Sequence, residues 1–189
     1  MTTNTTPIPT TDPARHLLLE AIQDALAQLT PRPTETGVVR HLVARTADGQ
    51  RAMPPRARLS AEGGMPRDRW ALGEAMPEQQ LTVMETDVAR LIANGQPLTL
   101  FGDNLFVDLD LSAQNLPIGT RLRAGEVLLR VTSEPHDGCK KFLTRFGKDA
   151  LRIVANPTWR QNNYRGIYMT VEESGWLAVD DTIEVVSRP

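Results

Sequence analysis

The sequence has a single cysteine among its 189 residues, which excludes an internal disulfide framework and any zinc or iron–sulfur site built on several cysteines. Aromatic residues make up only 5%, and no apolar run approaches the length of a membrane-spanning helix. The net charge of -2 supplies no general positive field for nucleic acid or an acidic membrane surface. We therefore expect a soluble cytoplasmic protein with no nucleic-acid or membrane partner, in which a local group of basic residues must bind any anionic ligand.

The chain is long enough for one well-buried core with peripheral additions. Residues 1–11, rich in Thr and Pro, are predicted to be a disordered leader and lack the basic and apolar parts of a secretory signal. Leu18, Ile22 and Leu29 belong to an apolar stripe with the helical period, which predicts an N-terminal helix over residues 12–30. A packing role is the favoured interpretation of that helix.

From residue 36 to residue 188 the pattern is mainly extended. Alternating apolar residues predict strands over 105–112 and 167–171, and Ala124-Gly125-Glu126 indicates a hairpin turn. Thr86–Ala93 is predicted to be a helix that ends at Asn94-Gly95. Many short strands with few helices favour a mainly β fold, a barrel or sandwich of mixed connections with a few peripheral α-helices.

The stretch from Glu134 to Gly147 contains the cysteine. Asp137 is predicted to be the N-cap of a short helix, which places Cys139 in its first turn. The helix dipole and the adjacent Lys140 and Lys141 favour a thiolate there, the form that acts as a nucleophile or metal ligand. The alternative is a cysteine that packs as a small buried hydrophobe.

Several short motifs occur in an order and spacing that resemble the MOSC domain, named for the carboxy-terminal domain of molybdenum-cofactor sulfurases. The resemblance covers about residues 36–188, and an earlier glycine-and-aspartate loop is similar to one in small stand-alone MOSC proteins. The motifs are Gly64-Met65-Pro66-Arg67-Asp68-Arg69-Trp70, Gly102-Asp103-Asn104-Leu105, residues 116–122, Cys139, Arg165-Gly166 and residues 179–183.

This resemblance implies a β-barrel that presents Cys139 at its mouth. In molybdenum-binding members the cysteine sulfur ligates molybdenum held by a pterin dithiolene, and the protein reduces N-hydroxylated substrates with electrons from a separate protein. In the other use the cysteine carries sulfur as a persulfide, received from a sulfur donor, for cofactor sulfuration. The family also has an association with pyridoxal phosphate. A third option is a module that binds a small anion without turnover.

A pterin cofactor carries a phosphate, so its site needs fixed cations or N–H donors near the cysteine. Arg165 is the favoured cation, because it matches the family's Arg-Gly at a strand start, and a surface arginine is the alternative. His136 is a candidate proton donor, or an exposed loop histidine. Gly138 stands where many family members have Pro. Further candidates for the cofactor are Arg69, Lys140, Lys141 and Arg145 as cations, with Asn104 and Asp68 for hydrogen bonds to the pterin.

Overall fold

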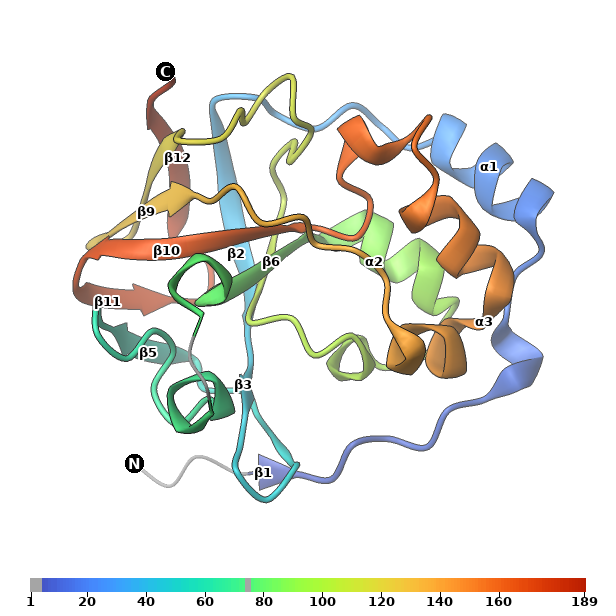
Figure 1. The fold of residues 1–189 in the computed structure, drawn as a ribbon, viewed down its shortest axis with the longest axis horizontal. Helices are drawn as coiled ribbons and strands as arrows, with labels where there is room; N and C mark the ends of the chain where they lie inside the picture. The colour runs from blue at the N-terminus through green and yellow to red at the C-terminus, as the bar shows by residue number, and fades with distance from the viewer. Residues whose placement is uncertain (1–4, 74–75) are drawn as a thin grey trace.

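A closed barrel of seven strands forms the body of the protein in the computed structural model, which describes residues 5–73 and 76–189 (Figure 1). Around the barrel the strand order is β10-β6-β7-β2-β12-β8-β9, and β9 pairs again with β10. Every pairing in the barrel is antiparallel except β6 with β7. The barrel strands are β2 (Thr36–Leu42), β6 (Leu81–Glu85), β7 (Leu105–Val107), β8 (Arg121–Ala124), β9 (Val127–Val131), β10 (Ile167–Glu173) and β12 (Thr182–Ser187).

The alternation in the sequence builds the barrel core. In β10, Ile167, Met169 and Val171 are buried, while the residues between them are only partly buried. The strand predicted over 105–112 is shorter than expected, because only Leu105–Val107 pairs with neighbours. Its second face is not polar either, since Phe106 packs into a separate core beneath the helices. The prediction of a mainly β barrel with peripheral helices is confirmed.

Three α-helices pack together on one side of the barrel (Figure 1). They are α1 (Leu19–Ala27), α2 (Thr86–Ala93) and α3 (Lys140–Ala155). Asn94 ends α2 in the left-handed conformation, as its sequence predicts. Gly147 interrupts α3 with a φ of 87°, so the helix consists of two halves joined at a kink. The helix predicted over 12–30 is shorter, and a separate 3₁₀ turn, η1 (Pro13–Arg15), precedes it.

Two small sheets complete the fold. The segment predicted to be a disordered leader contains β1 (Thr5–Thr6), which pairs with β4 (Arg51–Ala52), and β4 also pairs with β3 (Ala44–Arg45). Residues 1–4 of that predicted leader lie outside the described residues. The second sheet joins β5 (Arg56–Leu59) to β11 (Gly175–Ala178).

Short 3₁₀ turns connect these elements. The remaining turns are η2 (Arg69–Leu72), η3 (Pro77–Gln79), η4 (Leu98–Leu100) and η5 (Arg160–Asn162).

Among residues 5–73 and 76–189, the structure contains no helix with the length and apolar character needed to cross a membrane.

Candidate functional site

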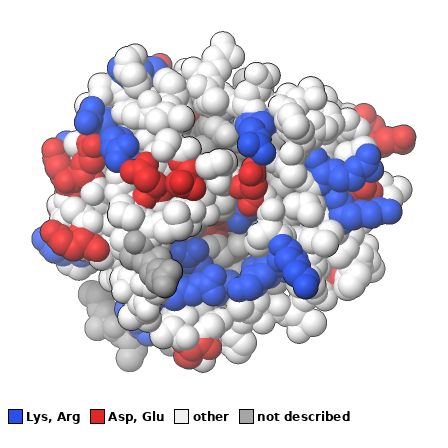
Figure 2. All heavy atoms as spheres, in the orientation of Figure 1, with Lys and Arg blue, Asp and Glu red and all other residues white. Residues whose placement is uncertain are grey.

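A cavity of about 220 Å³ lies between the barrel and the start of α3, and we call it the thiol cavity. Figure 2 shows Lys and Arg side chains gathered below the middle of this face, where the surface is hollowed. The cavity therefore combines a sulfur nucleophile with an unusual density of cations. Its lining includes Arg45, Arg51, Arg69, Thr82, Phe101, Gly102, His136, Asp137, Cys139, Lys141, Phe142, Arg145, Arg165 and Tyr168.

Cys139 is exposed at the wall of this cavity, so the interpretation as a buried hydrophobe is wrong. It occupies the N-cap position of α3, and its carbonyl oxygen accepts a hydrogen bond from the N–H of Leu143 at 3.0 Å. The prediction that Asp137 caps the helix is also wrong, because its carboxylate instead pairs with Arg160 at 3.3 Å. Cys139 therefore lies directly before the helix, two residues after Asp137, and is exposed.

Arg165 is buried and already has a counter-ion. Its Nη1 lies 3.0 and 2.8 Å from the two carboxylate oxygens of Asp103, which is fully buried. Its guanidinium carbon is 5.3 Å from the centre of the Phe142 ring. The alternative of a surface arginine is therefore wrong, yet much of the charge of Arg165 is neutralised before any ligand arrives. Its Nε is buried without a hydrogen-bond partner among the described residues, and can donate to a ligand.

His136 is held neutral at the edge of the same cavity. Burial, followed by the charges of Arg165 and Arg45, lowers the pKa of His136 well below its ordinary value. Its Nε2 lies 3.8 Å from an oxygen of Asp103, but that carboxylate is already engaged by Arg165. The ring centres of His136 and Tyr168 lie 4.4 Å apart with the rings tilted, and within the described residues Nδ1 of His136 has no hydrogen-bond partner. The exposed-loop interpretation of His136 is wrong, and at neutral pH the ring holds no extra proton to donate.

Asn104 and Asp68 have structural roles, contrary to the prediction that they are free for a pterin. The amide of Asn104 donates to Val43 and Asp68 and accepts from Thr82, while the residue is fully buried. Both oxygens of Asp68 accept bonds from Arg45, and its other donors are Asn104 and the N–H of Trp70. Burial alone raises the pKa of Asp68, but the hydrogen bonds and charge of Arg45 outweigh that effect and lower it. Neither side chain has a hydrogen-bonding position left open.

The side chains of three arginines, Arg51, Arg45 and Arg145, lie close to Gly102, which lines the cavity and has a φ of +80°. A Cβ atom built at Gly102 would lie 3.2 Å from Nη2 of Arg51 and 4.0 Å from Nη1 of Arg145. Burial, and then the charges of Arg145, Arg69 and Arg45, lower the pKa of Arg51 to about 10. Arg51 therefore stays charged at neutral pH although it is only 3% exposed.

The partners of these arginines are backbone oxygens rather than acids. Arg51 donates to the carbonyls of Thr99 and Gln50 at 3.0 and 3.2 Å, and Arg145 donates to Leu100 at 2.6 Å. In the described ranges, neither of them nor Arg69 has a carboxylate within ion-pair distance. Arg51, Arg69 and Arg145 all line the cavity, and we call them the arginine cluster; Arg51 is buried, Arg145 partly buried and Arg69 exposed.

The cluster was only partly predicted from the sequence. Arg69 and Arg145 were candidates, whereas Arg51 was missed because it follows an ordinary Asp48-Gly49 turn and resembles a solvated residue. Lys141 lines the cavity, but Lys140 does not and points elsewhere from an exposed position. Tyr168 was also missed, and burial raises the pKa of its hydroxyl, so it remains a hydrogen-bond donor.

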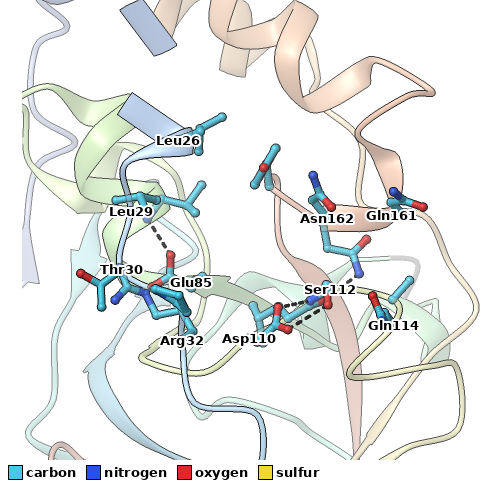
Figure 3. A pocket seen from close by; sticks show the side chains of 16 residues that line it. Leu26, Leu29, Thr30, Arg32, Glu85, Asp110, Ser112, Gln114, Gln161 and Asn162 are labelled. Carbon is cyan, nitrogen blue, oxygen red and sulfur yellow. Dashed lines mark hydrogen bonds and ion pairs between the residues drawn. The ribbon is translucent and has the colours of Figure 1, made fainter. Parts of the chain in front are cut away.

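A larger cavity of about 730 Å³ lies where the end of α1, the start of α2 and the η5 turn come together. Figure 3 shows Arg32 and Glu85 on one side of it, facing Asp110, Ser112 and Gln161 on the other. Arg32 bonds both Glu85 and Asp87, so the arginine of this cavity has its counter-ions within the protein, and we call it the paired cavity. Its lining contains no nucleophilic thiol and no histidine.

The MOSC resemblance implies a closed barrel with an accessible cysteine, and a family comparison shows the family itself. The model of the MOSC domain matches residues 74–184, which is more than half of the chain. The protein belongs to the MOSC domain family. Arg45, Arg51 and Arg69 precede the matched segment, so part of the cavity wall is built by residues outside it.

Solved structures share the fold. The YUAD protein from Bacillus subtilis matches with a TM-score of 0.60 at 19% identity, covering 82% of this chain and 97% of that one. YiiM from Escherichia coli matches with a TM-score of 0.53 at 24% identity, covering 80% and 71% respectively. YiiM from Geobacillus stearothermophilus has a TM-score of 0.52 at 15% identity, with 84% and 76% covered. No curated protein matches the sequence. At these identities the likeness establishes the fold alone.

Proposed function

We propose that this MOSC protein binds a molybdenum cofactor through the sulfur of Cys139 and reduces N-hydroxylated compounds. One observation carries the proposal: an exposed thiol shares a cavity with an arginine cluster that has no carboxylate partners in the described part of the chain. An uncompensated charge is costly to bury, and Arg51 is buried beside other cations, so a bound anion is expected to supply its missing partner.

The residues present suit a cofactor that carries both a metal and a phosphate. Arg51, Arg69 and Arg145 would hold the phosphate, with Gly102 leaving room for it to approach the backbone. This assignment replaces Arg165 and Lys140 as the main phosphate ligands, because the first is paired and the second lies outside the cavity. Among the described residues no group of three His, Cys, Asp or Glu is placed to hold a metal ion, which supports a metal that arrives within the cofactor.

The cofactor, when bound, supplies two-electron reduction of an N–O bond, with electrons delivered by a separate protein. Overall, an N-hydroxylated amine takes up two electrons and two protons and yields the amine and water. The chain itself contributes binding, orientation and neutral donors. His136 stays uncharged beside Arg165, and the protonated hydroxyl of Tyr168 can donate a hydrogen bond to a ligand in the cavity.

The second candidate function is a sulfur carrier. The exposure of Cys139 favours it, because a persulfide donor can reach the sulfur without any movement of the chain. In that step the thiolate attacks the outer sulfur of the donor persulfide, a new S–S bond forms, the donor S–S bond breaks, and the donor leaves as a thiolate. The arginine cluster has no necessary role in this reaction.

Metal analysis of protein from a host that makes the cofactor tests the proposal. We expect roughly one molybdenum per chain in the wild type and almost none in Cys139→Ser, since the sulfur is the only protein ligand proposed. Ser133→Ala is the matched control, because Ser133 is exposed nearby but does not line the thiol cavity. A wild type without molybdenum, which instead gains one sulfur on Cys139 in mass spectrometry with a sulfur donor, would establish the carrier.

A further inference from the structure

The N-terminal strap (residues 5–16) connects the two elements that carry Arg51 and Arg145 of the arginine cluster, β4 and α3. Figure 1 shows it running along the lower edge of the molecule from β1 toward α3. At its first end, Thr6 is the register partner of Arg51 in the β1–β4 pairing. Two residues later Ile8 lines the thiol cavity. The strap is therefore both a wall of the cavity and a backbone support for Arg51.

At its other end the strap contacts the kink in α3. Nε2 of His16 lies 3.2 Å from the carbonyl oxygen of Arg145. The His16 ring also packs on Gly147, where a built Cβ would come within 2.9 to 3.0 Å of the ring and its Cβ. Because Gly147 interrupts the regular helix, the backbone at Arg145 depends on such contacts from outside the helix.

Gln96 fixes the middle of the strap to the same carbonyl group. Its Oε1 accepts a hydrogen bond from the N–H of Asp12 at 2.9 Å, and its Nε2 donates to the carbonyl oxygen of Arg145 at 3.4 Å. Asn94 donates to the carbonyl oxygen of Arg15 at 3.0 Å, so the turn after α2 holds the strap at a second point. Both His16 and Gln96 thus converge on the main chain of Arg145.

We propose that the strap positions the arginine cluster for its anion, and that His16 is a positioning residue that holds Arg145 opposite Arg51. The inference rests on the proposed function for its ligand, a phosphate group. It goes further by assigning the geometry of the site to a segment that precedes the matched MOSC segment, residues 74–184. His16 acts through the backbone of Arg145 and does not itself touch the ligand.

Calorimetric titration of the full chain with inorganic phosphate tests this role. His16→Phe removes the nitrogen that faces the Arg145 carbonyl and should weaken phosphate binding at least fivefold. His16→Gln retains an N–H donor at the same reach, and we expect it to bind within about twofold of the wild type. Gln96→Met should weaken binding in the same direction through the second contact.

Two further measurements separate positioning from a general loss of structure. Thermal melting shows whether His16→Phe remains folded, and hydrogen exchange in residues 145–149 should rise in His16→Phe but not in His16→Gln. Arg32→Met is the control, because Arg32 lies in the paired cavity and has no contact with the strap in the described residues.

The outcomes distinguish this inference from the proposed function. If His16→Phe binds phosphate as tightly as the wild type while Arg51→Met does not bind it, the strap has no positioning role and the anion site stands. If the phosphate results are as expected but purified protein contains no molybdenum, the cofactor assignment fails and the strap inference stands. A wild type that does not bind phosphate overturns both.

Discussion

The thiol cavity and the paired cavity treat their arginines in opposite ways. In the larger, paired cavity Arg32 is bonded to Glu85 and Asp87, so its charge is balanced by the fold. In the smaller cavity Arg51 and Arg145 donate only to backbone carbonyls, and burial, followed by the charge of Arg145, lowers the pKa of Arg51. The smaller cavity is therefore the one for which we propose an anionic ligand.

The volume of a cavity is therefore a poor guide to whether it binds a ligand. In the cavity of about 730 Å³ the arginine is paired with two carboxylates, whereas the cavity of about 220 Å³ contains Arg51, a buried cation with no carboxylate partner in the described residues, which is costly in free energy. Within the thiol cavity the same contrast recurs on a smaller scale, because Arg165 has Asp103 and Arg51 has no acid among residues 5–73 and 76–189. Substitutions can test each side of the comparison.

The largest effect is expected where a balanced pair is broken. Asp103→Asn leaves Arg165 buried without its counter-charge and should lower the free energy of unfolding by about 3–5 kcal/mol. Asp108→Asn, the same change at the half-exposed pair with Arg40, should cost about 0–1 kcal/mol. Urea unfolding measures both. Equal losses in the free energy of unfolding would mean that burying the Asp103–Arg165 pair does not increase its contribution to stability.

Arg51→Met should change stability little and weaken phosphate binding strongly. It removes a charge that its neighbours already repel, so the free energy of unfolding should change by less than about 1 kcal/mol. Phosphate affinity should fall at least about tenfold, equivalent to about 1.4 kcal/mol. Titration calorimetry and urea unfolding on the same preparation check the two halves. A loss of stability as large as that of Asp103→Asn would contradict the contrast between the two arginines.

The neutral His136 should make stability depend on pH. Its pKa in the fold lies well below the ordinary 6.5, so below that pH the unfolded chain binds a proton that the folded chain does not. The free energy of unfolding should therefore fall as the pH falls below about 6.5, by up to about 1.4 kcal/mol per pH unit from this group.

Urea unfolding of the wild type and His136→Gln between pH 7.5 and pH 5.5, a range of about two units, isolates this contribution. The variant should have the shallower slope and retain the part due to His41, whose pKa is also lowered, first by burial and then by Arg90. Parallel curves for the two proteins would show that His136 accepts its proton in the fold.

The smallest effect is expected in the paired cavity. Arg32→Met removes one of three donors to the Glu85 carboxylate, which keeps the backbone N–H groups of Asp87 and Val88. The expected loss in the free energy of unfolding is about 1 kcal/mol, with phosphate binding unchanged. A fall in phosphate affinity would show that the paired cavity, too, contributes to anion binding.

Patterns with a local cause were predicted well from the sequence. The alternation in residues 167–171 specifies a half-buried strand, and Asn94 ends α2 because its side chain tolerates the left-handed conformation. Long-range choices were not predicted. Asp137 is a good helix cap in isolation, but in the fold Arg160 binds it and the helix starts two residues later.

Prediction of the candidate site from the sequence has the same limit. Cys139 was found because a single cysteine within a recognisable order of motifs is a local signal. Asn104 and Asp68 were assigned to a ligand because only the folded chain brings Thr82, Val43 and Arg45 to saturate them. Arg51 was not predicted as a site residue, because its neighbours in the sequence do not indicate that it is buried.

There is little space for a side chain at Gly138, the residue directly before Cys139. A Cβ atom at this position would lie 2.3 Å from Cδ1 of Leu151 and 3.0 Å from Cγ2 of Val154, both in the second half of α3. A larger residue at position 138 therefore requires the Leu151 and Val154 side chains, or the backbone next to Cys139, to shift. The packing of the second half of α3 thus limits which residue can precede the cysteine.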